Sequence, residues 1–461
     1  MAKKAKTVFV CQECGYESPK WMGKCICGAW NTMIEEKIPE IKEDKRRRSS
    51  ASEGGRKARP HILSDVQTGE SGKRIDTGIS ELNRVLGGGL VTGSLTLISG
   101  EPGIGKSTII MQAAANIAGK YGRVLYVSGE ESEEQIKLRA DRICGSLSPD
   151  LFILAETNME NVAAVAEELQ PKFVIIDSIQ TMYTEDLDSA PGSVSQVRAC
   201  GNELMRIGKT KDVPIFIVAH VTKSGDLAGP KIVEHLVDCV LNFSGERGRE
   251  LRILRAYKNR FGTTSEIGAF EMAPEGLVEI DDLSKRFLED IDDSSEGSIV
   301  TAVYEGTRPL LLEIQALTAQ SGVGFARRTA IGIDNGRLNM IIAVLERKAG
   351  LSLTNQDVYV NVVGGMKPEG TQVDLAAALA IHSSYAGRSA SKHTLALGEV
   401  GLTGDLRPVQ NAEKILKEAE RMGFKKIILP SSQAKKLEGK GGSIQIISVK
   451  NINEAIRNYC E

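Results

Sequence analysis

Residues 100–107 read GEPGIGKS and match the pattern G-x-x-x-x-G-K-[ST]. The apolar run over 95–99 predicts a buried strand before this stretch, and the pattern over 108–118 predicts a helix after it. Such a loop points successive backbone N–H groups at phosphate oxygens, and the helix adds its positive N-terminal end. The sequence therefore predicts a phosphate-binding loop. The alternative is a chance match in a chain with 47 glycines.

The predicted loop fits ATP with Mg²⁺. Lys106, expected to be exposed on the loop, would reach the β- and γ-phosphates, and the Ser107 hydroxyl would hold Mg²⁺. Residues 173–177 form an apolar run that ends in Asp177, which would meet Mg²⁺ through its water shell. The predicted nucleotide-binding residues are Gly100, Glu101, Pro102, Gly103, Ile104, Gly105, Lys106, Ser107 and Thr108.

Two acidic residues, Glu130 and Glu131, follow the predicted strand at 124–128. In a parallel sheet this position lies at the carboxyl edge, beside the γ-phosphate. One carboxylate there can orient and deprotonate the attacking water. The sequence favours Glu130, with Glu131 as the alternative, and both could also be the ordinary acidic start of the next helix.

The composition describes a soluble globular protein, since 41% of residues are hydrophobic and 26% are charged. A length of 461 residues predicts two or three domains. The net charge of −2 neither indicates nor excludes nucleic acid. No stretch approaches the ~20 continuous apolar residues of a membrane span, and the N-terminus lacks a secretion signal, so the cytoplasm is the expected location without a membrane.

Four of the eight cysteines, Cys11, Cys14, Cys25 and Cys27, fall within 17 residues. Four thiolates at such spacings predict a structural Zn²⁺ site. The second pair has only one residue between its cysteines, which tightens the loop and makes tetrahedral geometry harder to reach. The alternatives are a redox pair, or weaker metal binding by three thiolates and water.

The chain divides by composition. Over 61–280, strands alternate with helical segments such as 133–143, which predicts an α/β domain whose parallel sheet ends in antiparallel strands. Residues 299–461 predict a separate α+β domain. The remaining stretches are a zinc module at 1–36, a charged linker at 37–60, whose basic run is either a solvated tether or a nucleic-acid contact, and a second linker at 281–298.

These patterns resemble known families. The phosphate-binding loop, its strands and the acidic pair resemble the RecA-type ATPase core, which includes hexameric helicases of the DnaB type. Lys258-Asn259-Arg260-Phe261-Gly262 resembles the signature of the bacterial RadA (Sms) family, and so do the cysteine module and its Lys20-Trp21-x-Gly23 and Trp30-Asn31-Thr32 segments. The family has two residues between the second pair of cysteines, so Cys25-Ile26-Cys27 departs from it.

The C-terminal domain resembles the proteolytic domain of Lon, which carries a Ser/Lys dyad. The segment that should hold the nucleophile, 368–376, contains no Ser. Asp374 and Glu413 occupy the places of the dyad, and Lys414 is one position out of register. The domain is therefore interpreted as an inactive protease and as a platform for assembly and DNA binding, because Lon-like domains form hexameric rings.

The family resemblance implies an ATP-driven motor on single-stranded and branched DNA, acting in recombinational repair on intermediates made by the RecA recombinase. It implies a homo-oligomer, expected to be a hexamer, in which Lys258 and Arg260 form a cationic finger that reaches the γ-phosphate of the neighbouring subunit. From the sequence alone, these two residues could equally be a solvated basic turn.

In RecA-type proteins the loops after the fourth and fifth strands contact DNA, which here are 178–197 and 222–234. Lys223 and Lys231 are the cations of the second loop, and Lys258 and Arg260 are further expected DNA contacts. His220 is either a γ-phosphate sensor or a buried structural histidine. The rival functions are an ATP-dependent protease, a clock-type ATPase switch, and a DNA-binding scaffold that ATP switches between conformations.

Overall fold

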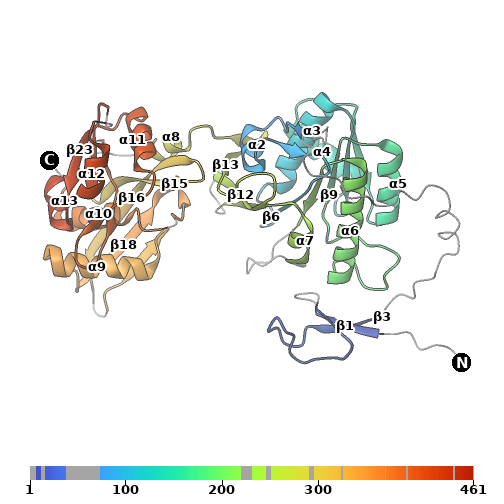
Figure 1. Cartoon of the computed structure of the whole chain (residues 1–461), viewed down its shortest axis with the longest axis horizontal. Helices are drawn as coiled ribbons and strands as arrows, with labels where there is room; N and C mark the ends of the chain where they lie inside the picture. Colours follow the sequence, from blue (N-terminus) through green and yellow to red (C-terminus); the bar gives the residue numbers. More distant parts are fainter. Residues whose placement is uncertain are drawn as a thin grey trace, which may run out of the picture. The chain divides into compact units, whose positions relative to one another are not determined.

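The structure is a computed structural model of the whole chain (Figure 1). Its contacts divide the chain into two compact units, Met1–Glu279 and Ile280–Glu461. None of the helices among the described residues combines the length and the apolar character needed to cross a membrane. The residues that the structure describes are 7–11, 16–37, 73–219, 231–245, 251–289, 295–322, 325–368, 370–390, 393–439 and 442–459.

The first unit begins with a small antiparallel sheet of three strands in the order β2-β1-β3. Cys11, Cys25 and Met33 are buried at its centre, and Phe9 and Met22 pack against them. Such a small core is typical of modules that a metal ion stabilises. The strands are β1 (Thr7–Cys11), β2 (Glu17–Ser18) and β3 (Met33–Lys37).

The rest of this unit is built on a nine-stranded sheet in the order β14-β13-β12-β11-β6-β10-β9-β7-β8. The strands from β11 to β8 are parallel to their neighbours, and β12, β13 and β14 continue the sheet antiparallel. The strands are β6 (Leu95–Gly100), β7 (Val124–Ser128), β8 (Leu151–Ala155), β9 (Phe173–Asp177), β10 (Ile215–Val218), β11 (Cys239–Ser244), β12 (Leu251–Asn259), β13 (Ile267–Ala273) and β14 (Gly276–Glu279).

Helices cover both faces of this sheet, because successive strand residues point to opposite faces. Ile98 and Ile175 belong to a core shared with α2 (Ser80–Leu86), α3 (Lys106–Tyr121) and α4 (Glu133–Ile143). Leu97 and Ile176 belong to the opposite core, shared with α5 (Met159–Leu169), α6 (Val194–Lys211) and α7 (Lys231–Leu236). The short strands β4 (Arg74–Ile75) and β5 (Leu90–Val91) pair separately.

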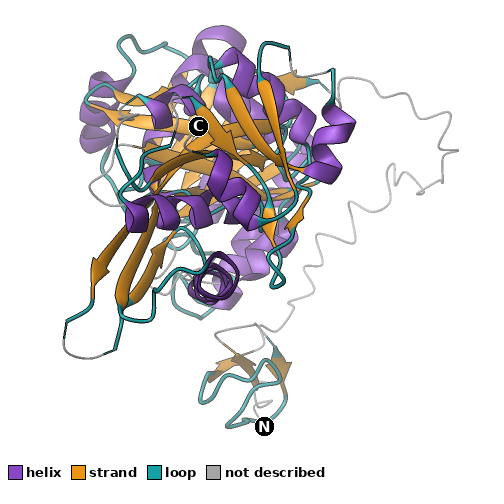
Figure 2. Cartoon of the chain, turned by 90° about the vertical axis from the view of Figure 1, so that its left-hand side faces the viewer, coloured by secondary structure: helices purple, strands orange, loops and turns teal. Residues whose placement is uncertain are grey.

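The second unit contains a mixed seven-stranded sheet in the order β17-β18-β16-β15-β19-β22-β23 (Figure 2). Its strands are β15 (Ser298–Glu305), β16 (Arg308–Gln320), β17 (Arg328–Ile331), β18 (Gln356–Val362), β19 (Thr394–Ala396), β22 (Lys426–Pro430) and β23 (Gln445–Val449). A separate pair joins β20 (Glu399–Val400) to β21 (Leu406–Arg407).

The helices of this unit include α10, which is buried over most of its surface. They are α8 (Leu283–Leu288), α9 (Asn335–Ala349), α10 (Asp374–Ala386), α11 (Ala412–Arg421), α12 (Ser431–Leu437) and α13 (Ile452–Asn458), with the 3₁₀ turn η4 (Val363–Gly365). The α+β organisation predicted from the sequence is therefore present.

Two stretches differ from the prediction. The predicted linker over 281–298 contains α8, because Asp282 caps its first turn by accepting from the Lys285 N–H, and Leu283 and Phe287 are buried. The predicted loop over 178–197 ends early, since Ser193 caps α6 at Val194. The linker prediction weighted acidic and serine residues as linker formers, and the loop prediction followed the resemblance to RecA-type proteins, although Asp and Ser are also good helix caps.

Candidate functional site

The phosphate-binding loop joins β6 to α3, as the sequence predicts. Gly100 has a φ of 152°, and a Cβ atom there would lie 2.5 Å from the carbonyl oxygen of Phe243 on the neighbouring β11. Gly105 caps α3 in the left-handed region, with a φ of 116°. The loop therefore requires glycine both for its close packing and for its turn into the helix.

Lys106 is 3% exposed, so the expectation of an exposed loop lysine was wrong. Its Nζ donates to the carbonyl oxygens of Gly100 at 2.8 Å and Glu101 at 3.0 Å, which holds the ammonium group inside the loop. Burial lowers the pKa of Lys106 to about 8, although the charges of Asp177 and Glu130 act in the opposite direction. Ser107 and Thr108 follow in the first turn of α3 and are half-buried.

Asp177 ends β9 and is buried beside this lysine. The Tyr126 hydroxyl, from the neighbouring strand β7, donates to Asp177 Oδ2 at 2.5 Å. Arg139 of α4 donates in turn to the Tyr126 hydroxyl at 3.1 Å. Burial raises the pKa of Tyr126 well above its ordinary value, and the charge of Asp177 raises it further. The tyrosine is therefore a fixed neutral donor to the carboxylate.

The two acidic residues after β7 face different partners. Glu130 Oε1 accepts from the hydroxyl of Ser178, the residue after Asp177, at 2.6 Å. Glu131 instead pairs with Arg139 at 2.5 Å between Oε2 and Nη1. Glu130 therefore lies with the loop lysine and the strand-end aspartate, whereas Glu131 is tied to Arg139 in the middle of α4.

Lys258 and Arg260 lie at the amino ends of the parallel strands, which form the edge of the sheet opposite the phosphate-binding loop. β11 runs parallel to β6, and β12 returns antiparallel, so Asn259 pairs with Cys239 at the amino end of β11. Arg260 Nη1 lies 3.2 Å from Asp238 Oδ1, and Lys258 Nζ donates to the Glu234 carbonyl oxygen at 2.7 Å. Burial and the charge of Arg260 lower the pKa of Lys258.

Other side chains fix the turn that carries these cations. Asn259 accepts from the Phe261 N–H at 2.9 Å and donates to the Val85 carbonyl oxygen at 3.2 Å. A Cβ atom at Gly262 would lie 3.1 Å from the Cα of Gly87. A side chain at Gly262 would therefore press against Gly87, and Asn259 holds the turn in place.

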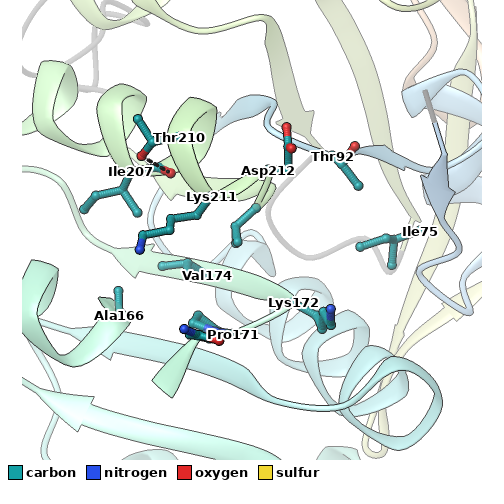
Figure 3. A pocket seen from close by; sticks show the side chains of 12 residues that line it. Ile75, Thr92, Ala166, Pro171, Lys172, Val174, Ile207, Thr210, Lys211 and Asp212 are labelled. Atoms are coloured by element: carbon teal, nitrogen blue, oxygen red, sulfur yellow. Dashed lines mark hydrogen bonds between the residues drawn. The ribbon is translucent and has the colours of Figure 1, made fainter. Parts of the chain in front are cut away.

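The same edge of the sheet contains a cavity of about 510 Å³ between the ends of α5 and α6 (Figure 3). Lys172 and Lys211 are among its lining residues, and Lys211 pairs with Glu167 at 3.2 Å. The cavity has no glycine-rich loop and lies away from the carboxyl ends of the strands. It is therefore separate from the predicted nucleotide site.

The Sγ atoms of Cys11, Cys25 and Cys27 lie within 4.8 Å of one another. The Cys11 and Cys27 sulfurs are 3.9 Å apart, close to the ~3.8 Å edge of a tetrahedron with Zn–S bonds of ~2.3 Å. The turn between the second pair is closed by the Gly28 N–H, which donates to the Cys25 carbonyl oxygen at 2.9 Å. The shortened pair therefore still directs both sulfurs to one place, which fits Zn²⁺.

In the second unit, the two residues at the places of the protease dyad have other partners. Asp374 is buried, and Arg337 donates to both of its carboxylate oxygens, one of them at 3.0 Å. Glu413 pairs with Lys417 at 3.8 Å. The hydroxyl available in the nucleophile segment, that of Thr371, donates to Glu399 at 2.8 Å. Neither position offers an activated nucleophile.

Some predicted site residues cannot be placed. Cys14, His220 and Lys223 lie outside the described residues, and so does the side chain of Lys231. Conversely, the sequence reading missed residues that support the site, namely Tyr126, Arg139, Ser178 and Asp238. A tyrosine within the apolar run at 124–128 was an available signal, because a buried hydroxyl needs a hydrogen-bond partner.

Family models agree with this division of the chain. Family models match residues 9–35 (Rubredoxin metal binding domain), 59–226 (AAA domain) and 320–433 (Subunit ChlI of Mg-chelatase). The solved KaiC-like protein from Pyrococcus horikoshii covers 45% of this chain and 99% of its own, with 20% identity and a TM-score of 0.38.

Two curated relatives match along nearly their whole length. The chain is 51% identical to the DNA repair protein RadA of Bacillus subtilis, over 98% of both chains. It is 50% identical to the DNA repair protein RadA of Halalkalibacterium halodurans, over 99% of both chains. With an N-terminal zinc ribbon, a RecA-like P-loop ATPase domain and a C-terminal domain of the ChlI and Lon type, the chain belongs to the family of the DNA repair protein RadA.

Proposed function

We propose that this protein is a DNA-dependent ATPase that forms a hexameric ring on single-stranded DNA and drives branch migration of intermediates made by the RecA recombinase. The family supports a role in DNA repair, and the AAA domain supports ATP hydrolysis. The observation that carries the finer proposal is the position of Lys258 and Arg260, across the sheet from the phosphate-binding loop of their own chain.

The phosphate-binding loop and the Lys258–Arg260 turn lie at opposite ends of the parallel strands. They are separated by the length of β6, which is 6 residues or roughly 16 to 20 Å at ~3.3 Å per residue. Arg260 is therefore too far from its own loop to stabilise a phosphate bound there. A cation at this edge reaches a nucleotide only when that nucleotide belongs to a neighbouring subunit. This favours a ring in which each interface joins one loop to the next subunit's finger.

The loop edge holds the groups that hydrolysis needs. Lys106 would neutralise phosphate charge, and Glu130 would orient and deprotonate the attacking water. Ser107 and Asp177 offer hydroxyl and carboxylate oxygens, which fit Mg²⁺, and the ion would supply charge stabilisation at the phosphates. The Ser178 hydroxyl donates to Glu130 at 2.6 Å, so it would fix the orientation of that base. Glu131 is the weaker choice because Arg139 already neutralises it.

Asp238 would hold the Arg260 side chain until a nucleotide binds in the neighbouring subunit and attracts the arginine. Its carboxylate is 6% exposed and also accepts from the Leu95 N–H at 3.1 Å and from Lys209 at 3.3 Å. The Arg260 side chain is 57% exposed, so it can leave this partner for a γ-phosphate without unfolding the edge. Lys209 and the Leu95 N–H would keep the aspartate paired.

DNA contact is proposed for Lys223 and Lys231 on the loop at 222–234. Lys258 and Arg260 would contribute further contacts. Their positive charge would bind phosphates, so binding would depend on salt and be indifferent to sequence. The zinc ribbon would be held by Zn²⁺ on Cys11, Cys14, Cys25 and Cys27. The C-terminal domain would serve as an assembly and DNA-binding platform, because Asp374 and Glu413 lack the chemistry of a protease dyad.

The experiment for this function measures the mass of the full chain and its rate of ATP hydrolysis, with and without single-stranded DNA. The expected result is a hexamer whose ATPase rate rises on adding DNA. A protein that binds DNA and ATP but shows no DNA stimulation would support the scaffold alternative. ATP-dependent cleavage of unfolded protein, lost on substitution in the C-terminal domain, would support the protease alternative.

A mixing experiment tests the finger. Arg260→Ala should bind ATP and assemble but hydrolyse it on the order of 10³-fold more slowly, as typical for loss of a trans-acting arginine. Lys106→Ala should be equally inactive. In mixed rings, some interfaces join the intact phosphate-binding loop of an Arg260→Ala subunit to the intact Arg260 of a Lys106→Ala subunit. Activity should therefore partly return. Two variants that co-assemble yet regain no DNA-stimulated hydrolysis would contradict a trans role.

A further inference from the structure

The zinc ribbon exposes large apolar side chains. Trp21 and Trp30, the chain's two tryptophans, are 55% and 67% exposed. Ile26, between the second pair of cysteines, is 73% exposed. Tryptophan is buried in most folded domains, and a group of exposed apolar side chains on a small module marks a binding surface.

Both tryptophans lie on one hairpin-like segment. Lys24 and Trp30 form an antiparallel bridge, which places their side chains on the same face. The Lys24 Nζ lies 5.4 Å from the centre of the Trp30 ring. The Trp21 ring covers Gly23, where a Cβ atom would lie 3.6 Å from it, and the exposed Lys20 precedes Trp21. The Trp30 ring therefore has an ammonium group beside it, and Trp21 has an exposed lysine next to it in the chain.

This pairing fits single-stranded nucleic acid. Every base has a flat face that stacks on an aromatic ring, and every nucleotide carries a phosphate that an ammonium group attracts. A duplex hides its base faces, so it offers the rings much less. An apolar protein segment is a poorer match, because the lysine beside the Trp30 ring would lose hydration without gaining a partner.

We propose that Trp21 and Trp30, with Lys20 and Lys24, form a base-stacking site for single-stranded DNA on the zinc ribbon. The site deepens the proposed function and rests on it for the choice of strand. It supplies base-stacking contacts that the loops at 178–197 and 222–234 lack, since those two loops contain few aromatic residues. The expected binding is tolerant of sequence, and its stacking part persists at salt concentrations that remove phosphate contacts.

The test uses the intrinsic fluorescence of the full-length protein, because both of its tryptophans belong to the proposed site. Oligothymidylate should quench this fluorescence as it binds. An abasic strand of the same length, which keeps the phosphates and sugars but has no bases, should cause much less quenching. A duplex of the same length should resemble the abasic strand.

Three variants measure the contribution of stacking at elevated salt. Trp21→Ala should weaken binding of oligothymidylate about tenfold, the size expected for losing one stacked base. Trp21→Phe keeps an aromatic ring and should recover most of that loss. Ile34→Ala removes an apolar side chain that is 53% exposed on β3 of the same module, and it should bind as the unchanged protein does. Zinc content, measured for each variant, shows whether the module stays folded.

The outcomes separate this site from the proposed function. Oligothymidylate that stimulates the ATPase without changing tryptophan fluorescence would overturn the stacking site and leave the function standing. Equal quenching by abasic and normal strands would also overturn it, as would Trp21→Ala that keeps its zinc and its full affinity. Quenching by oligothymidylate without ATPase stimulation would support the site and contradict the function.

Discussion

Two buried aspartates, Asp177 in the first unit and Asp374 in the second, show how differently one residue type can be used. Asp177 accepts a hydrogen bond from Tyr126, which is neutral. Asp374 accepts from Arg337, which is charged. The tyrosine orients the carboxylate without adding a positive charge, whereas the arginine cancels the charge of its carboxylate within the fold.

The difference teaches that the partner of a buried carboxylate, more than its burial, indicates a functional site. Around Asp177, Lys106 is itself buried, and its pKa is lowered to about 8. Perturbed groups that gather in one place are typical of a catalytic site. Around Asp374, Arg337 also donates to the Val400 carbonyl oxygen at 3.1 Å, so the pair ties α9, α10 and β20 together. In the proposed function the first aspartate serves the chemistry of ATP hydrolysis, whereas the second ties structural elements together.

The largest expected effect is on Asp177. Asp177→Asn should lower ATP hydrolysis on the order of 10³-fold, because a neutral amide no longer attracts Mg²⁺ at the phosphates. Asp374→Asn is the matched control and should still hydrolyse ATP, while losing stability in the second unit. Steady-state ATPase rates of the two variants check this. Equal rates in the two variants would break the comparison.

Arg337→Ala should destabilise the second unit by about 3 to 5 kcal/mol, because it leaves the charge of Asp374 buried and unpaired. The double variant Arg337→Met with Asp374→Leu removes both charges and should regain most of that stability. Hydrogen exchange of α10 compared with α3 reports the two units separately. Unchanged exchange in α10 of the single variant would show that the pair does not stabilise the unit.

Tyr126→Phe removes one hydroxyl from the loop edge and should raise the Mg²⁺ concentration for half-maximal ATPase activity about tenfold, since a hydrogen bond to a charged group contributes about 1.5 to 3 kcal/mol. Tyr121→Phe is the control, because the Tyr121 hydroxyl accepts from the backbone N–H of Asp76, at 3.2 Å, whereas the Tyr126 hydroxyl donates to Asp177. Mg²⁺ titrations of the ATPase give the answer. The same Mg²⁺ dependence in both variants would remove Tyr126 from the site.

The pKa of Lys106, about 8, predicts that ATP binding weakens as pH rises. If bound ATP needs the charged lysine, affinity at pH 9 should be about tenfold lower than at pH 7. The sign for stability is opposite: the unfolded chain binds more protons between about pH 8 and 10.5, so this group's contribution to stability rises with pH there. Binding titrations from pH 7 to 9 test the expected loss of affinity, and affinity that is flat over this range contradicts the lowered pKa of Lys106.

The sequence predicted much of the fold because its signals are local. The predicted helix at 133–143 has the bounds of α4, since Ser132 and Gln135 form a capping box at its start. The predicted strands at 124–128 and 173–177 have the bounds of β7 and β9. Long apolar runs between turn residues identify such strands without knowledge of their neighbours. The longest strand, β16, was not predicted, because Arg308 and Pro309 and its later polar residues interrupt the apolar pattern.

The candidate site was predictable only where the chain carries it in one stretch. The glycine loop, Lys106 and Ser107 are contiguous, so their spacing alone identifies them. The sequence favoured Glu130 over Glu131, and the contact that supports this preference joins Glu130 to Ser178, which lies 48 positions away in the sequence. Asp374 was located by family resemblance, but its arginine partner is 37 positions away and has no sequence signal.

By itself, the sequence determined that a strand, a glycine loop and a helix follow one another, because backbone preferences act within a few residues. It also determined that four cysteines are closely spaced near the N-terminus. Only the tertiary structure decided that Tyr126 reaches Asp177 from the next strand, and that Lys258 and Arg260 stand at the far edge of the sheet from Lys106. Strand order and direction decide those positions. They arise from hydrogen bonds and apolar packing between segments far apart in the chain, which no local pattern encodes.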